Sequence, residues 1–168
     1  MKLFSRRLLT TTHNVTVGNY LYWQESDGLD LNAYYQRSYV WEEKEQQEFL
    51  YSVFNNLPLG TIAIIDKDTY IEGEPNYEVV DGKQRITTIL LYLNNNIPYK
   101  TEEGDYYFKD LDAPTSRQLR SRGMPYQCLY HGMTEKDKLE YFYRINFTGV
   151  PQSEAHMEKV LGLLGEQP

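Results

Sequence analysis

Apolar residues between positions 42 and 56 follow a helical period. Phe49, Leu50, Val53 and Phe54 recur at i, i+1, i+4 and i+5 and share one face. Glutamates in the first turn of this segment suit the positive end of a helix dipole. The pattern predicts an amphipathic helix with a buried face, which ends before the Leu-Pro-Leu-Gly sequence that follows it.

The next two apolar stretches are short and have the composition of strands. Residues 61–65 are apolar and β-branched, which predicts a buried strand, and residues 77–80 predict a second strand. After Asp81 and Gly82 the period becomes helical again over residues 83–93. The sequence therefore predicts a strand, a sharp turn and a helix in direct succession.

Weaker patterns predict the remaining elements. In chain order these are a strand near 15–17, a short helix near 20–21, a strand at 106–108, a helix at 114–122 with Gly123 as its C-cap, a strand at 125–130, a helix opened by a Thr134–Asp137 capping box and ended by Gly149–Pro151, and a last helix capped by Ser153 and running through Leu164. This mixture favours an α+β fold. We expect residues 31–168 to form one domain, and the place of residues 1–30, inside or outside its core, stays open.

Composition excludes several classes of protein. The 168 residues carry a formal net charge of −7, so any contact with nucleic acid requires a local basic patch. Cys128 is the single cysteine, which rules out an internal disulfide and four-cysteine zinc sites. No apolar run approaches the roughly 20 residues of a membrane span. We expect no signal peptide, no membrane contact and a cytoplasmic location.

The turn after residue 80 has the chemistry of an anion site. The first amides of a helix lack intrahelical partners and lie at its positive end, where they bind anions. Gly82 permits close approach of a ligand to the backbone, Lys83 and Arg85 add positive charge, and Asp81 offers a ligand for a divalent ion or for a water. An Asp-Gly pair that merely caps the helix explains the same residues. The spacing is not that of a Walker A loop.

Two other segments have a functional and a structural interpretation. Tyr35 could stack on a base and Arg37 could touch phosphate. Alternatively, Trp41 or Val40 packs on the core as a hydrophobic staple and Arg37 is solvated. Further on, Asn146 precedes a Thr-Gly pair at a helix end, which suits either a pocket or a C-cap.

Taken together, the three segments resemble the N-terminal domain of GmrSD-type restriction enzymes, within the ParB/sulfiredoxin superfamily. The matching residues, in order, are Tyr35-Gln36-Arg37 with Trp41, Leu57-Pro58-Leu59-Gly60, Asp81-Gly82-Lys83-Gln84-Arg85 with Thr87-Thr88, and Phe142, Ile145, Asn146 and Gly149. Their order and spacing agree over roughly residues 30–155.

This resemblance implies a ParB/sulfiredoxin-like fold that binds nucleoside triphosphates and is expected to hydrolyse them with Mg²⁺, in a bacterial or phage-infected cell. It makes Asp81 and Arg85 the candidate catalytic residues and Asp81 the metal ligand. The candidate nucleotide-binding residues are Tyr35, Gln36, Arg37, Gly82, Lys83, Gln84, Thr87, Arg144 and Asn146.

Two departures from the family pattern keep other functions open. Lys83 stands where the family usually has glutamine, and His13, His131 and His156 are too widely separated to suggest a His-Asn-His nuclease centre. We therefore expect any nuclease to lie on a partner protein. The alternative is a non-catalytic nucleotide-sensing or protein-interaction module, for example a phage inhibitor of a host protein. A ParB-like nuclease that acts directly on DNA fits the net charge of −7 less well.

The remaining candidates have simpler explanations. Cys128 sits in an apolar strand without an adjacent base and is expected to be a buried structural thiol, which argues against sulfiredoxin chemistry. The basic residues Lys100, Arg117, Arg120 and Arg122 suit a solvated face, or a contact with DNA or a partner.

Overall fold

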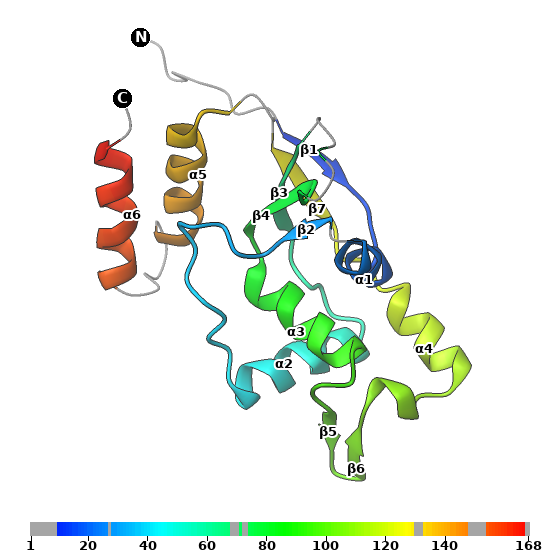
Figure 1. The fold of residues 1–168 in the computed structure, drawn as a ribbon. Coiled ribbons are helices and arrows are strands. Elements are labelled where there is room, and N and C mark those ends of the chain that lie inside the picture. The colour runs from blue at the N-terminus through cyan, green and yellow to red at the C-terminus, as the bar shows by residue number, and fades with distance from the viewer. Residues whose placement is uncertain are drawn as a thin grey trace.

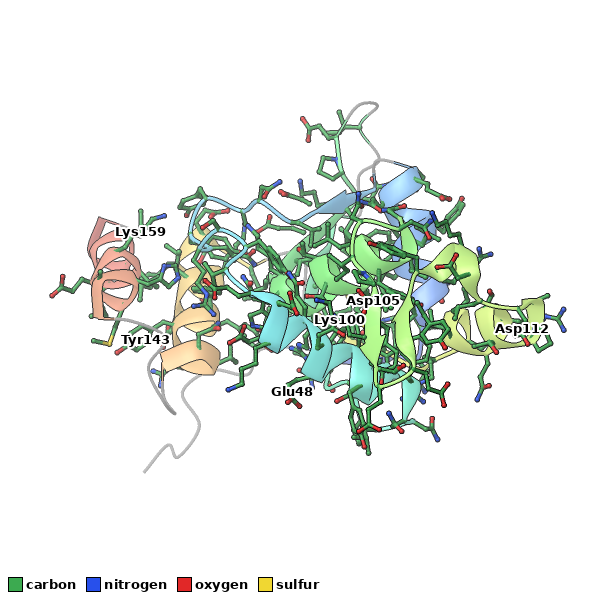
Figure 2. The ribbon with its side chains drawn as sticks, turned by 90° about the horizontal axis from the view of Figure 1, so that it is seen from below. Glu48, Lys100, Asp105, Asp112, Tyr143 and Lys159 are labelled. Atoms are coloured by element: carbon green, nitrogen blue, oxygen red, sulfur yellow. The ribbon has the colours of Figure 1, made fainter. Side chains whose placement is uncertain are left out.

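A mixed five-stranded sheet forms the centre of the fold (Figure 1). The computed structural model describes residues 10–26, 28–67, 71, 74–129, 133–147 and 154–166. The strands are β1 (Thr10–His13), β2 (Leu29–Asp30), β3 (Ile62–Asp66), β4 (Tyr77–Asp81) and β7 (Tyr126–Leu129), in the spatial order β1-β7-β3-β4-β2. A separate hairpin pairs β5 (Tyr99–Thr101) with β6 (Gly104–Tyr106), and Lys100 lies opposite Asp105 in it (Figure 2).

Six α-helices and one short 3₁₀ helix surround the sheet in the described parts of the chain. They are α1 (Val17–Glu25), α2 (Glu43–Phe54), α3 (Lys83–Leu93), α4 (Ala113–Arg120), α5 (Glu135–Phe147) and α6 (Glu154–Glu166), with η1 (Phe108–Asp110) before α4. Figure 1 shows α5 and α6 on one side of the sheet, and α1, α2 and α3 away from them. None of the described helices combines the length and apolar character needed to cross a membrane.

Both faces of the central strands are buried. Ile62 and Ile64 of β3 pack into the core with α1, α2 and α3, whereas Ala63 and Ile65 pack into a second core with α5 and α6. Successive side chains of a strand point to opposite faces, so an unbroken apolar run is what a strand covered on both sides requires. This arrangement confirms the strand predicted at 61–65 and places β4 beside it, between two layers of helices.

The sequence located the central elements well. The helix predicted at 42–56 is α2, the strand at 77–80 is β4, and the helix at 83–93 is α3 with the predicted bounds. The α+β class is confirmed. Val17 and Tyr20 of α1 are fully buried, so this part of the N-terminal segment contributes to the core.

Three local predictions were wrong. The strand expected near 15–17 lies at Thr10–His13, where all four residues are exposed and polar and so give no hydrophobic signal. The strand expected at 106–108 ends at Tyr106, and Phe108 begins η1. Ser121, not Gly123, is the C-cap of α4. The predicted end of α5 at Gly149–Pro151 and the cap at Ser153 lie outside the described residues.

The predicted capping box at the start of α5 is confirmed. The Thr134 amide donates to Asp137 Oδ2 at 3.0 Å, and the Asp137 amide donates to Thr134 Oγ1 at 3.2 Å. Thr134→Ala removes the second of these bonds and is expected to lower the free energy of unfolding by about 1 kcal/mol. Urea unfolding checks this, with Thr134→Ser, which keeps the hydroxyl, as a control that stays near wild type. An equal loss of unfolding free energy in Thr134→Ala and Thr134→Ser would contradict the capping role of the hydroxyl.

Candidate functional site

The turn between β4 and α3 leaves a helix end open. Gly82 is the N-cap of α3 with φ +100°, and no side chain caps the helix. The first intrahelical bond joins the Ile86 amide to the Gly82 carbonyl at 2.9 Å. This corrects the view of Asp81 as a simple cap, because Asp81 still belongs to β4. The amides of residues 83–85 are left at the positive end of α3, and no side chain among the described residues caps them.

A cavity of about 190 Å³ lies at this helix end, and it is lined by three segments that are far apart in the sequence. Three of the lining side chains are cationic and one is anionic. The residues are Gln36, Arg37 and Trp41 from the loop before α2, Val80 to Arg85 from the turn, and Phe142 and Asn146 from α5. The cavity is therefore a concentration of positive charge in a chain whose formal net charge is −7.

Arg85 joins the turn to the residues that precede β3. Its Nη1 donates to the Leu59 carbonyl at 3.0 Å, and its Nη2 donates to the Thr61 carbonyl at 3.1 Å and to Asp81 Oδ2 at 3.0 Å. Gly60, with φ +75°, makes room for the guanidinium, because a Cβ there would collide with Arg85 Nη1. These contacts explain physically why the Leu-Pro-Leu-Gly and Asp-Gly-Lys-Gln-Arg sequences occur together.

The comparison with protein families decides the relationship. The family model for the GmrSD restriction endonuclease N-terminal domain matches residues 21–161. The chain belongs to this family. Neither a curated protein nor a solved structure matches it detectably. The matched range contains all three segments that line the cavity, so this GmrSD N-terminal domain assembles its cavity entirely from the family's own residues.

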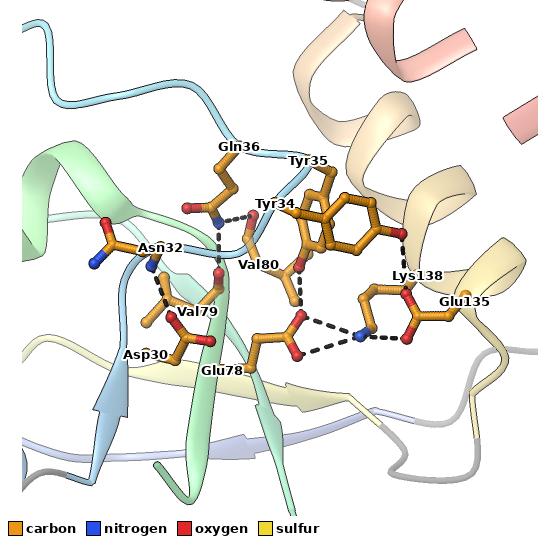
Figure 3. A network of polar contacts seen from close by, with 10 residues as sticks. All are labelled: Asp30, Asn32, Tyr34, Tyr35, Gln36, Glu78, Val79, Val80, Glu135 and Lys138. Atoms are coloured by element: carbon orange, nitrogen blue, oxygen red, sulfur yellow. Dashed lines mark hydrogen bonds and ion pairs between the residues drawn. The ribbon is translucent and has the colours of Figure 1, made fainter. Parts of the chain in front are cut away.

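Two glutamines of this GmrSD N-terminal domain are held in the lining by backbone groups. Gln36 Nε2 donates to the carbonyls of Val79 and Val80, and Gln36 Oε1 lies on the other side of the amide (Figure 3). That oxygen is buried and has no hydrogen-bond partner among the described residues. Gln84 Oε1 accepts from the amides of Val40 and Trp41, at 2.9 and 3.2 Å. Gln84 thus fixes the loop before α2, while Gln36 presents an unused acceptor.

The cationic lining residues differ in how freely they can meet a ligand. Arg85 uses three of the five N–H groups of its guanidinium on the protein. Lys83 Nζ donates to Asn32 Oδ1 at 3.3 Å, and burial lowers the pKa of the Lys83 ammonium group. Arg37 lines the cavity as predicted. Lys83 and Arg37 are consequently the more available charges, and Arg85 first of all supports the turn.

Three predicted residues do not line the cavity. Tyr35 is fully buried, and its hydroxyl donates to Glu78 at 2.8 Å, so its ring cannot stack on a base. Burial also raises the pKa of that hydroxyl. Arg144 is exposed and pairs with Glu140 at 2.8 Å on the outer face of α5. Thr87 lies on α3 beyond the lining.

The lining residues that were not predicted as site residues are apolar. Trp41, Val80 and Phe142 line the cavity, although in sequence they look like ordinary core residues. The structure confirms that Trp41 packs on the core, as the staple interpretation expects, but its partner is not the residue at the usual staple position. The ring centroids of Trp41 and Phe49 lie 5.7 Å apart. The residue at the usual staple position, Gln46, is polar, and its Nε2 donates to the Trp41 carbonyl.

The site offers a divalent ion a single carboxylate. Among the described residues, no group of three or more histidines, cysteines and carboxylates lies close enough together to hold a metal ion. Mg²⁺ in nucleotide sites is typically bound by one or two carboxylates and by the substrate phosphates, with water completing the shell. Asp81, whose side chain is 35% exposed, fits a Mg²⁺ that arrives with a nucleotide.

Proposed function

We propose that this domain binds a nucleoside triphosphate as its Mg²⁺ complex and hydrolyses it in support of a restriction nuclease carried by a partner. The observation that carries the proposal is the uncapped N-terminus of α3, which opens into a cavity with three cationic side chains. Free amides at the positive end of a helix, beside lysine and arginine, are a recurring site for phosphate.

The nucleoside end of the ligand fits the other wall of the cavity. Trp41, Val80 and Phe142 offer apolar surface, and Gln36, which also lines the cavity, has a buried side-chain oxygen with no hydrogen-bond partner among the described residues. Leaving such an acceptor unpaired costs about 1–3 kcal/mol. Ionised phosphate oxygens only accept hydrogen bonds, so a ligand donor to Gln36 would have to come from the base or the sugar. We therefore propose that the triphosphate lies at α3 and the nucleoside towards the loop before α2.

The chain's own groups suit phosphoryl transfer. The amides of residues 83–85, with Lys83 and Arg37, would stabilise charge on the phosphoryl oxygens. Asp81 would hold Mg²⁺, which neutralises phosphate charge when it is bound, or would orient the attacking water. Arg85 would keep Asp81 and the turn in place through the 3.0 Å ion pair. We also infer that the strand–Asp-Gly–helix unit belongs to the ParB/sulfiredoxin superfamily.

A second candidate is a non-catalytic nucleotide sensor that acts by contacting another protein. The Asp81–Arg85 ion pair supports it, because it engages the carboxylate that would otherwise serve a metal or a water. Release of inorganic phosphate separates the two: turnover that requires Mg²⁺ supports the hydrolase, and tight binding without turnover supports the sensor.

A thermal-unfolding scan with ATP, GTP, CTP and UTP, with and without Mg²⁺, tests the binding. A ligand at 100 times its Kd should raise the unfolding free energy by about 2.7 kcal/mol, which corresponds to about 5–10 °C in Tm. Lys83→Met is expected to weaken the Kd by about tenfold, because a charge-assisted hydrogen bond to phosphate is lost.

Lys44 on the exposed face of α2 provides the matched control. Lys44→Met removes the same charge from an exposed side chain that does not line the cavity and should change the Kd by less than about twofold. Equal weakening by both substitutions would mean that only the overall charge matters. No shift with any of the four nucleotides would contradict the proposed function.

A further inference from the structure

A buried ion-pair cluster lies beside Gln36 and Val80, two residues that line the cavity (Figure 3). Lys138 of α5 is 12% exposed, and its Nζ lies 3.2 Å from Glu78 of β4 and 2.8 Å from Glu135. Glu78 also accepts the Tyr35 hydroxyl at 2.8 Å. The cluster therefore joins three separate segments: the loop before α2, strand β4 and helix α5.

Burial of these charges lowers the folding stability unless their distances and hydrogen bonds compensate for the lost hydration. Moving charges out of water carries a penalty of several kcal/mol per ion, and apolar residues of similar shape often give equal or greater stability. Apolar packing from Val80, Leu139 and Phe142 already holds α5 against the sheet. The charged groups thus add little stability beyond what apolar packing supplies. What they add is a fixed orientation and register of α5 on β4.

Each of the three central members is a near neighbour of residues that line the cavity. Tyr35 precedes Gln36. Glu78 precedes Val79 and Val80, whose carbonyls accept hydrogen bonds from Gln36 Nε2. Lys138 lies one helical turn before Phe142 on α5, on the same side of the helix. Displacement of any one member would move a wall of the cavity, although Tyr35, Glu78 and Lys138 do not line it themselves.

We propose that Glu78, Lys138 and Tyr35 are positioning residues for the nucleotide site. They lock the loop before α2 and helix α5 onto β4, so that Gln36 and Phe142 face the N-terminus of α3. The proposal rests on the proposed function for its ligand, and it adds a set of residues that act through others and never touch the nucleotide.

Two adjacent tyrosines give a matched test. Tyr35→Phe removes the buried bond to Glu78, and Tyr34→Phe removes an exposed bond to Glu135 in the same cluster. At a temperature where both variants are fully folded, Tyr35→Phe should weaken the nucleotide Kd by about tenfold, as the loss of a supporting partner typically does. Tyr34→Phe should stay within about twofold of wild type, because its bond is solvent-exposed and contributes little.

A second variant tests the same role in a protein that is expected to stay folded. Lys138→Met alone leaves Glu78 as a buried, uncompensated charge and is expected to unfold the protein readily. The double variant Glu78→Gln/Lys138→Met removes both charges and keeps the side-chain volumes. It should fold with a Tm near that of wild type and still bind nucleotide about tenfold more weakly.

Amide hydrogen exchange over residues 32–40 distinguishes positioning from general stability. Exchange there should rise in Tyr35→Phe and in the double variant, and should be unchanged in Tyr34→Phe. If Tyr35→Phe and the double variant change only the Tm, leaving both Kd and exchange as in wild type, the positioning role is overturned. If the wild type binds no nucleotide, the proposed function fails, and the exchange pattern alone then supports or overturns the positioning role.

Discussion

Gly82→Ala is expected to destabilise the protein by about 2–5 kcal/mol and to close the anion site. At φ +100° an alanine carries a backbone penalty of about 1–2 kcal/mol, since only glycine visits this region freely. The new methyl group would also collide with Ile62 Cδ1, in a core position that is fully buried. Overpacking of this kind costs about 1–3 kcal/mol. Urea unfolding and nucleotide titration measure the two effects.

Two controls separate strain from collision. Gly104→Ala also places alanine at positive φ, +145°, but meets no atom within 4 Å, so it reports backbone strain alone. In an Ile62→Val background the nearest colliding atom, Cδ1, is absent, and Gly82→Ala should recover part of its lost stability. Equal losses of stability in Gly82→Ala and Gly104→Ala, with no recovery in the Ile62→Val background, would contradict the close contact between the turn and β3.

Arg85→Met is expected to lower the unfolding free energy by about 2–4 kcal/mol and to eliminate measurable nucleotide binding. The substitution removes three hydrogen bonds, two of them to the carbonyls of Leu59 and Thr61. Hydrogen bonds to charged groups are worth about 1.5–3 kcal/mol each, but the side chain is 21% exposed, so solvent screening reduces the sum. The loss is measured by urea unfolding and by titration with nucleotide at low temperature.

Arg144→Met is the matched control for Arg85. Arg144 makes an i,i+4 ion pair with Glu140 in which the two side chains are 67% and 50% exposed. Such exposed pairs contribute about 0.3–0.5 kcal/mol. Stability and nucleotide affinity should therefore remain close to wild type. A loss of affinity comparable to that of Arg85→Met would restore Arg144 to the site and contradict its placement on the outer face of α5.

The predictable part of the fold is the part with strong periodicity. The change from β4 to α3 was visible because Val79 and Val80 lead directly into Asp81-Gly82 and a helical pattern. The unbroken apolar run of β3 showed a strand buried on both faces. Strand β1 was misplaced because an exposed edge strand of Thr and His carries no hydrophobic alternation.

The candidate site was predictable as a set of segments but not as a set of roles. Sequence order brought Gln36, Asp81 and Asn146 together through the family resemblance, and the cavity contains all three. The sequence could not show that Tyr35 turns into the core, because two adjacent tyrosines give no hydrophobic period that tells the buried one from the exposed one. Nor could it show that Glu78 meets Lys138, since a pair 60 residues apart depends on how α5 packs on β4.

We expect the first amides of α3 to bind the phosphates of a nucleotide. Amide chemical shifts, followed by NMR while the Mg²⁺ complex of each nucleotide is added, report on each of these amides separately. The largest changes should fall on Lys83, Gln84 and Arg85, with smaller changes at Gln36 and Phe142. Changes confined to another surface, such as the one formed by Gly18 of α1 and Arg117 of α4, or no changes at saturating nucleotide, would contradict this binding mode.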